Sequence, residues 1–156
     1  MAQECEHMND TVYILNGPNL NLLGVREPHV YGSTTLAEVE QLCRRVCAEL
    51  GLRCEFRQSN HEGVLVDWVQ EAREKAAAVV VNPAGLSFRS IPLLDALKTL
   101  DQPIAEVHIT NIHRRDPLYQ QSLISLAATG VICGFGAFGY ELAIRAVAQR
   151  LAIAAA

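Results

Sequence analysis

The chain alternates between short apolar runs and longer segments with helical periodicity. The apolar runs are rich in β-branched residues, which favours strands. They cover residues 12–15, 78–81, 104–109 and 131–133, and a further strand is expected at the more polar segment 53–58. The helical patterns cover residues 35–50, 63–75, 91–100, 118–127 and 140–151. The run at 78–81 is continuously apolar, as expected of a strand buried on both faces of a parallel sheet.

The segment 35–50 carries helix signals at both of its ends. Thr35 is followed three residues later by Glu38, which is the spacing of a capping box. Gly51 comes directly after the last turn, where a residue in the left-handed conformation commonly ends a helix. Periodicity, cap and stop therefore predict the same helix.

The order strand then helix, found five times along the chain, predicts an α/β fold. Right-handed crossovers between such strands give a parallel sheet that helices cover on both faces. We expect a flavodoxin-like three-layer sandwich with a five-stranded sheet, because an eight-stranded barrel needs about 250 residues and the chain has 156. Residues 11–156 should form a single domain, and the polar residues 1–10 a disordered N-terminal lead.

Composition narrows the class of protein further. Half of the residues are hydrophobic and the formal net charge is −4, without a basic run. This balance disfavours nucleic acids and anionic membranes as partners. We find no apolar stretch of the ~20 residues that a membrane span needs and no signal peptide, so we expect a cytoplasmic protein. The five cysteines include no Cys-x-x-Cys motif, which favours reduced thiols.

Polar residues gather directly after the predicted strands. The segments concerned are 16–19, 58–62, 82–85, 108–111 and 134–136, and asparagine occurs in four of these five. Turn formation would explain any one of these loops by itself. The carboxyl ends of parallel strands, however, meet at one edge of the sheet, where ligands bind. The sequence therefore predicts a binding site at that edge.

Two pairs of residues in this region suit acid–base chemistry. Glu106 and His108 lie two apart in a strand, so they face the same side and the carboxylate can orient the imidazole. A core histidine paired only to satisfy its hydrogen bonds is the alternative. The irregular segment 16–32 is long for a compact domain, which is typical of a lid. It carries Arg26 and Tyr31, and a guanidinium beside the phenol would favour tyrosinate.

Two other motifs carry little weight. Gly134, Gly136 and Gly139 have the spacing of a dinucleotide-binding loop, but no further strand–helix unit follows to bind the ribose. Close packing of a helix on the sheet is the better interpretation of these glycines. His108 and His113 lie five apart without a cluster of further ligands, so no metal site is predicted.

Several long motifs, in order, resemble the type II 3-dehydroquinate dehydratase family. They are the segments 14–24, 26–28, 31–32, 57–63, 106–111, 128–132 and 139–140, and the resemblance extends over about residues 12–150. It implies a flavodoxin-like lyase that eliminates water from 3-dehydroquinate, by anti elimination through an enolate, to give 3-dehydroshikimate. It further implies no cofactor and a homododecamer built from trimers. A role in aromatic biosynthesis, in quinate breakdown or in a specialised pathway stays open.

The resemblance also implies the catalytic residues, carried over position by position. Tyr31 matches the base, and Arg26 matches its activating neighbour on the lid. His108 matches the acid that protonates the leaving hydroxyl, and Glu106 orients it. Asn19 matches the residue that holds a water molecule or the enolate oxygen.

Five further positions match the family's substrate-binding groups. Asn82, with the backbone N–H groups of Ile109 and Thr110, matches the cradle for the substrate carboxylate. Asp95 matches an aspartate that reaches into the site of a neighbouring subunit. Arg115 matches an arginine near the site.

The chain departs from the family pattern on one side of the expected pocket. Phe88 stands in place of a histidine and Tyr119 in place of an arginine, and both family residues bind substrate hydroxyls. An arginine usual at the position of Leu94 is also absent. Three interpretations remain: ordinary 3-dehydroquinate dehydration with contacts relocated to Tyr119, Arg89 or Arg114; dehydration of a related cyclic hydroxy-keto acid; or a non-catalytic carboxylate-binding or scaffold paralogue.

Overall fold

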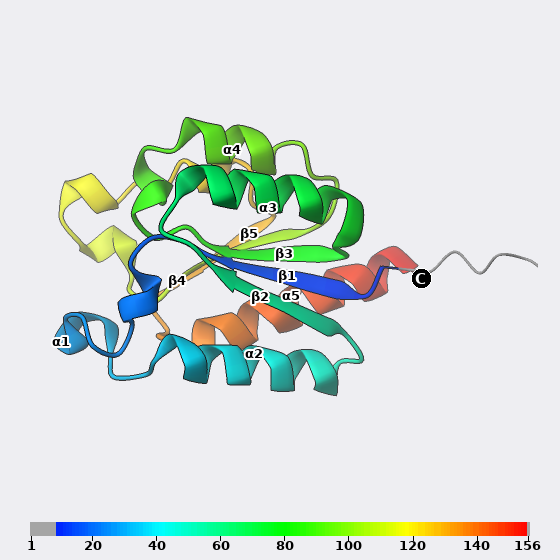
Figure 1. The fold of residues 1–156 in the computed structure, drawn as a ribbon, viewed down its shortest axis with the longest axis horizontal. Coiled ribbons are helices and arrows are strands. Elements are labelled where there is room, and N and C mark those ends of the chain that lie inside the picture. Colours follow the sequence, from blue (N-terminus) through cyan, green and yellow to red (C-terminus); the bar gives the residue numbers. More distant parts are fainter. Residues whose placement is uncertain (1–8, 156) are drawn as a thin grey trace, which may run out of the picture.

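The computed structural model describes residues 9–155, which form one open sheet with helices on both faces (Figure 1). The strands are β1 (Thr11–Asn16), β2 (Arg53–Gln58), β3 (Ala78–Asn82), β4 (Ile104–His108) and β5 (Gly130–Cys133). Neighbouring strands pair in parallel, in the order β2-β1-β3-β4-β5. This is the strand order of flavodoxin-like folds, so the predicted fold class is confirmed.

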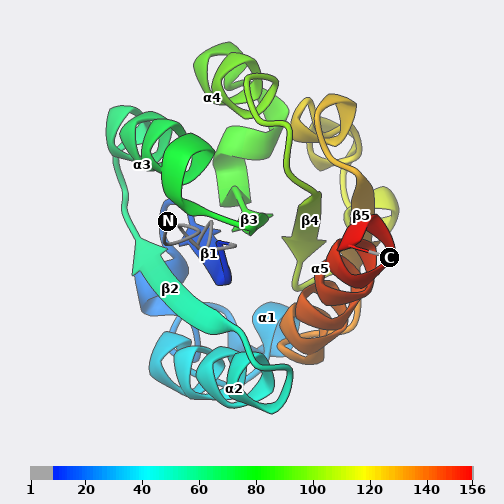
Figure 2. The ribbon, with the colours of Figure 1, turned by 90° about the vertical axis from the view of Figure 1, so that its right-hand side faces the viewer.

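The helices divide between the two faces of the sheet. They are α1 (Pro28–Tyr31), α2 (Leu36–Glu49), α3 (Glu62–Lys75), α4 (Ile91–Leu97) and α5 (Phe138–Ala155). Helices α3 and α4 cover one face and α2 and α5 the other, and the view along the sheet in Figure 2 separates the two layers. The short α1 lies apart from these layers, beside the carboxyl ends of the strands (Figure 1).

Each face of the sheet has its own apolar core, because successive residues of a strand point to opposite sides. In β1, Ile14 packs into the core beneath α2 and α5, which includes Val39 and Ile144. The next residue, Leu15, packs into the core beneath α3 and α4, which includes Leu65. The sheet is therefore buried under apolar side chains on both of its faces.

Helix α2 begins as the sequence predicts. The Glu38 backbone N–H donates to Thr35 Oγ1 at 3.2 Å, and the Thr35 backbone N–H donates to Glu38 Oε2 at 2.7 Å. These reciprocal bonds form the predicted capping box. Gly51 follows the helix with a φ of 71°, as expected of a residue that ends one.

The helix predicted at 118–127 is wrong. That segment forms two short 3₁₀ turns, Pro117–Tyr119 and Ile124–Leu126. The Leu123 N–H donates to the Ser87 carbonyl at 2.7 Å, and serine hydroxyls of the segment bond to Glu106 of β4. These long-range contacts replace the ladder of a helix, so strands β4 and β5 are joined without an α-helix. Helix α4 also ends three residues earlier than predicted, at Leu97.

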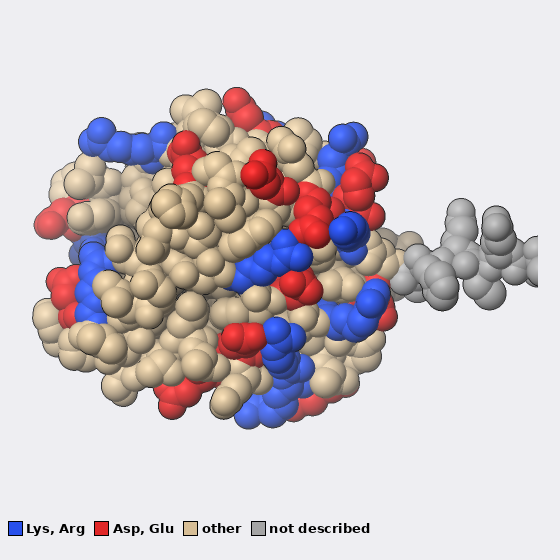
Figure 3. All heavy atoms as spheres, viewed as in Figure 1, with Lys and Arg blue, Asp and Glu red and all other residues tan. Residues whose placement is uncertain are grey.

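The ends and surface of the chain add little to the functional argument. Most of the predicted lead, residues 1–8, lies outside the described residues, whereas Asp10 pairs with Arg53 at 2.6 Å. Within residues 9–155, no helix has the length and apolar character needed to cross a bilayer. On the face drawn in Figure 3, basic and acidic side chains are interspersed.

Candidate active site

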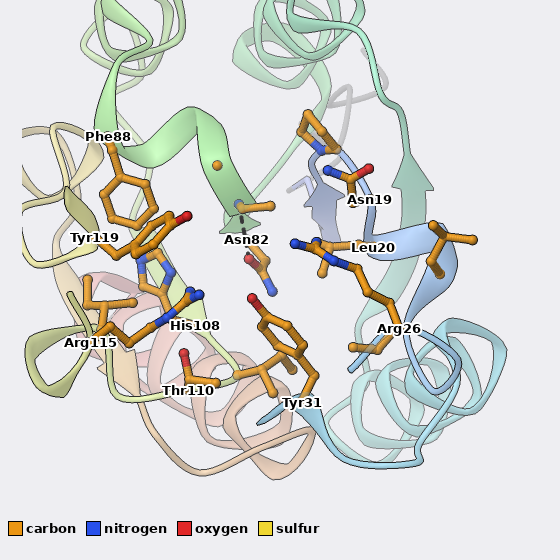
Figure 4. Close-up of a pocket in the computed structure, with 17 residues that line it drawn as sticks. Asn19, Leu20, Arg26, Tyr31, Asn82, Phe88, His108, Thr110, Arg115 and Tyr119 are labelled. Atoms are coloured by element: carbon orange, nitrogen blue, oxygen red, sulfur yellow. Dashed lines mark hydrogen bonds between the residues drawn. The ribbon is translucent and has the colours of Figure 1, made fainter. Parts of the chain in front are cut away.

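A cavity of about 270 Å³ opens at the carboxyl ends of the strands, beneath the loop that carries α1 (Figure 4). Its walls come from the loops after β1, β3 and β4 and from the segment before β5. Ten of the twelve site residues predicted from the sequence line it. They are Asn19, Arg26, Tyr31, Asn82, Phe88, His108, Ile109, Thr110, Arg115 and Tyr119.

His108 enters the cavity from the last position of β4, with a buried carboxylate behind it. The His108 Nε2 atom lies 2.6 Å from Glu106 Oε1, and both side chains are buried. Ser125 Oγ donates to the other carboxylate oxygen at 2.6 Å, and Ser122 Oγ donates to Glu106 Oε1. The strand alternation that predicts a shared face for Glu106 and His108 is therefore observed.

These contacts determine the ionisation of Glu106 and the orientation of the imidazole. Burial raises the pKa of Glu106, but hydrogen bonds from His108, Ser122 and Ser125 outweigh burial and hold that pKa below its ordinary value. An ionised Glu106 can only accept, so His108 Nε2 carries a hydrogen. The other ring nitrogen, Nδ1, is then the one that can exchange a proton with a ligand.

The depressed pKa of Glu106 gives a prediction about stability. A group of this kind stabilises the fold fully above its unfolded-state pKa, and its contribution is lost as the pH falls through the lower folded-state pKa. Replacing Ser125 with alanine removes one donor to the carboxylate, which should cost about 1.5–3 kcal/mol at neutral pH. Urea unfolding at neutral and acidic pH should show this cost shrink in acid. An equal cost at both would contradict the assignment.

Tyr31 reaches the cavity from the lid, at the end of α1. Pro28 occupies the first turn of this helix, and Glu27 precedes it with a positive φ of 41°. The Tyr31 hydroxyl points toward the middle of the cavity (Figure 4). The Arg26 guanidinium lies 5.5 Å and that of Arg115 lies 5.7 Å from the centre of its ring. Two guanidinium groups thus face the ring of the phenol.

Asn82 lies at the end of β3 and is held by a residue that the sequence analysis did not single out. Its Nδ2 donates to the Tyr140 hydroxyl at 2.8 Å, and that hydroxyl donates to Asn16 Oδ1 at 2.7 Å. Burial raises the pKa of Tyr140 far above its ordinary value, so the hydroxyl stays protonated. The sequence signal for this role is the hydroxyl of Tyr140, which stands directly after Gly139 at the start of a mainly apolar helix.

Asn19 is positioned by the loops on either side of it. Its backbone N–H donates to Asn60 Oδ1, after β2, at 2.9 Å. Gly17 brings the loop after β1 against the loop after β3, because a Cβ at this position would lie 2.4 Å from the Pro83 carbonyl oxygen. Only glycine allows such an approach without a shift of the backbone.

Backbone strain is concentrated around the cavity. Among residues 9–155, the non-glycine residues with positive φ are Asn19 (69°), Glu27 (41°) and Ala84 (51°). Asn19 and Ala84 line the cavity, and Glu27 lies next to Arg26 on the lid. Strained conformations persist where the surrounding structure enforces them, and they gather at functional sites. Their positions support the cavity as the functional site.

The departures from the family pattern meet in one wall of the cavity. The rings of Phe88 and Tyr119 pack edge to face, with their centres 5.4 Å apart and their planes at 77°. Of the groups considered as replacement donors, Tyr119 lines the cavity, whereas Arg89 and Arg114 are exposed side chains outside its lining. Asp95 is exposed on α4 and also lies outside the cavity of this chain.

The described residues offer little to a metal ion. Within residues 9–155, no group of three or more histidine, cysteine or acidic side chains is arranged to bind one. Cys43, Cys47, Cys54 and Cys133 are free thiols, and Cys5 lies outside the described residues. The polar side chains that line the cavity include a phenol, an imidazole, amides and guanidinium groups.

The fold and the cavity together define an α/β enzyme site for acid–base chemistry on a small oxygenated ligand. The model of the class II dehydroquinase family matches residues 10–148. The chain is 53% identical over 141 residues to a 3-dehydroquinate dehydratase from Phenylobacterium zucineum. The aligned region covers 90% of this chain and 97% of that protein. The chain therefore belongs to the class II dehydroquinase family.

Solved structures agree with this assignment. A type II dehydroquinase from Propionibacterium acnes superposes with a TM-score of 0.87 and 41% identity, over 92% of this chain and 99% of that one. A 3-dehydroquinate dehydratase-like protein from Bifidobacterium longum gives a TM-score of 0.69 at 32% identity, over 91% of this chain and 98% of that one. The resemblance inferred from the sequence motifs is therefore confirmed.

Proposed function

We propose that the chain is a hydro-lyase that dehydrates 3-dehydroquinate to 3-dehydroshikimate, by anti elimination through an enolate. The observation that carries the proposal is that Tyr31 of the lid and His108 of the sheet line one cavity. The relatives named 3-dehydroquinate dehydratase support the substrate.

Tyr31 is the proposed base. As tyrosinate, favoured by Arg26 and Arg115, it takes a proton from the carbon next to the substrate ketone. Negative charge then develops on the ketone oxygen, which needs donors already in place to stabilise it. Asn19 is suited to this role, directly or through a water molecule, because its loop is fixed by Asn60.

His108 is the proposed acid. The enolate expels the hydroxyl group from the neighbouring position, and this group needs a proton to leave as water. The imidazolium of His108 supplies that proton, and the ionised Glu106 stabilises the imidazolium beforehand. We assign the substrate carboxylate to Asn82 and to the backbone N–H groups of Ile109 and Thr110, because these residues line the cavity and the last two directly follow His108.

A steady-state assay tests this function directly. Purified protein mixed with 3-dehydroquinate should form a conjugated enone, which absorbs in the ultraviolet, and a chelator should leave the rate unchanged because no step uses a metal. Binding of 3-dehydroquinate without turnover would support a non-catalytic carboxylate-binding paralogue instead. Neither turnover nor binding would contradict the proposed substrate.

A second candidate function is favoured by the wall formed by Phe88 and Tyr119. Apart from the Tyr119 hydroxyl, this pair presents ring atoms to the ligand. A buried substrate hydroxyl facing them would lack partners, at a cost of about 1–3 kcal/mol each. A related cyclic hydroxy-keto acid that lacks such hydroxyls, or bears an apolar substituent, would suit the wall better.

The variant Phe88→His distinguishes between the two proposed substrates. If the wall has drifted from 3-dehydroquinate, a restored donor should raise kcat/KM for that substrate by about tenfold, since roughly 1.4 kcal/mol corresponds to a factor of ten. The exposed Phe135, replaced by histidine, is the matched control and should leave kcat/KM unchanged. An unchanged or lower value for Phe88→His would count against drift.

The assembly is part of the proposal. We infer a homododecamer built from trimers, in which Asp95 reaches the site of a neighbouring subunit. Its exposed place on α4, outside the cavity of its own chain, supports this assignment. Sedimentation velocity should give a single species of twelve chains, and a stable monomer with full activity would contradict the role of Asp95.

A further inference from the structure

The guanidinium of Arg115 lies between two aromatic rings of the cavity. Its Cζ atom is 4.2 Å from the centre of the Tyr119 ring and 5.7 Å from that of Tyr31. Phe88 packs edge to face with the Tyr119 ring. A continuous row of contacts, called the stack below, therefore runs from the donor-poor wall to the proposed base, through Phe88, Tyr119, Arg115 and Tyr31 (Figure 4).

The rings are the contacts that orient this guanidinium. Within the described part of the chain, no carboxylate lies at ion-pair distance from Arg115, whereas Arg26 pairs with Glu27 at 3.4 Å. The backbone of Arg115 is held separately, since Gln120 Nε2 donates to its carbonyl at 2.6 Å. Without an anionic partner, the field of the guanidinium at the groups that it faces is not offset by a neighbouring negative charge.

The local chain brings Tyr119 to this position. Pro117 begins a 3₁₀ turn, and the Tyr119 N–H donates to the Asp116 carbonyl at 2.8 Å. The turn places the ring four residues after Arg115, with the guanidinium carbon over the ring at 4.2 Å from its centre. A guanidinium that contacts a ring through its face still has N–H groups at its edge, which can donate to a phenolate or to a ligand.

We propose that Tyr119 is a positioning residue that holds Arg115 against Tyr31, so that the aromatic wall tunes the base. This inference rests on the proposed role of Tyr31. It assigns to the Tyr119 ring a function separate from any hydrogen bond that its hydroxyl makes to the substrate. Arg26 is the other cation that faces Tyr31, with Glu27 beside it, so loss of the stack weakens the stabilisation of tyrosinate without abolishing it.

The test compares Tyr119→Leu, which removes the ring, with Tyr119→Phe, which keeps it. Tyr119→Leu should lower kcat roughly tenfold, the size expected for a lost cation–ring contact. The acidic limb of its kcat profile should move to higher pH, with a smaller change in KM. Tyr119→Phe should retain several times more kcat than Tyr119→Leu and keep the wild-type pH profile, whatever its KM.

A spectroscopic titration makes the test independent of turnover. The tyrosinate absorbance of Tyr31 is obtained, without substrate, as the difference between each protein and its Tyr31→Phe counterpart. It should develop at higher pH in Tyr119→Leu, by roughly one pH unit for a tenfold effect, and not in Tyr119→Phe. If the protein proves inactive on 3-dehydroquinate, this shift still tests the stack.

Three outcomes would overturn the proposal. One is a Tyr119→Leu protein with wild-type tyrosinate titration and pH profile. Another is a shift of equal size in Tyr119→Phe, which would implicate the hydroxyl. The third comes from a double-mutant cycle with Arg115→Ala: Tyr119 should add little once Arg115 is gone, so additive effects would show that the ring acts by another route. Urea unfolding of each variant reports any loss of folding separately.

Discussion

Replacing Tyr31 with phenylalanine is expected to lower kcat for 3-dehydroquinate by about 10²–10⁴-fold, the usual contribution of a positioned base. The hydroxyl points into the cavity and the ring packs against the core at its edge. Phenylalanine keeps the ring and its packing, so the free energy of unfolding should change little. The loss should therefore fall on kcat, measured by enone formation, and less on KM.

Tyr13→Phe is the matched control for this variant. Tyr13 is buried on β1, 4% exposed, with its ring beside Arg57 and outside the cavity. Loss of its hydroxyl should leave kcat within about twofold of wild type, since it takes no part in proton transfer. Near-normal turnover by Tyr31→Phe on the true substrate would remove Tyr31 from the role of base.

Replacing His108 with alanine is the second large effect, again about 10²–10⁴-fold in kcat. Without the imidazole, the hydroxyl group must leave as hydroxide, and the buried Glu106 loses one of its donors. Some loss of stability is expected for that reason, and urea unfolding measures it separately. His113→Ala is the control, because His113 is exposed and lies outside the cavity. Full activity in His108→Ala would contradict the assignment of the acid.

The strands were predictable because the signals for them are local. The β-branched runs locate β1, β3, β4 and β5 to within one residue at each end, and the predicted segment 53–58 coincides with β2. The capping box at Thr35 and Glu38 fixes the start of α2 in the same way, since its bonds join residues three apart. Parallel order and crossover rules then suffice for the fold class.

The segment between β4 and β5 was mispredicted because distant contacts decide its conformation. Its apolar pattern suggests a helix, but its hydroxyls bond to Glu106 and its backbone bonds to Ser87. Without these hydroxyls the buried Glu106 would keep only His108 as a partner, and the bonds that complete its shell stabilise the observed turns in place of the predicted helix. Periodicity carries no information about such contacts.

In the candidate site too, positions set by local signals were predictable and contacts between distant residues were not. Residues that follow a strand, such as Asn82 and His108, could be placed from the sequence because parallel strands end at one edge. The bond from Asn82 to Tyr140 joins residues 58 apart, and the stack of Tyr119, Arg115 and Tyr31 joins the lid to another loop. Their geometry depends on packing across the cavity, which no local pattern encodes.

Hydrogen exchange in D₂O tests most directly whether Tyr31 and His108 act as base and acid on one bound substrate. In the absence of the acid, the base should still form the enolate, so His108→Ala should exchange the substrate hydrogen next to the ketone for deuterium while little product appears. Tyr31→Phe should give neither exchange nor product. Nuclear magnetic resonance of the substrate measures the exchange. Exchange by Tyr31→Phe at the rate of the wild-type protein would contradict the account.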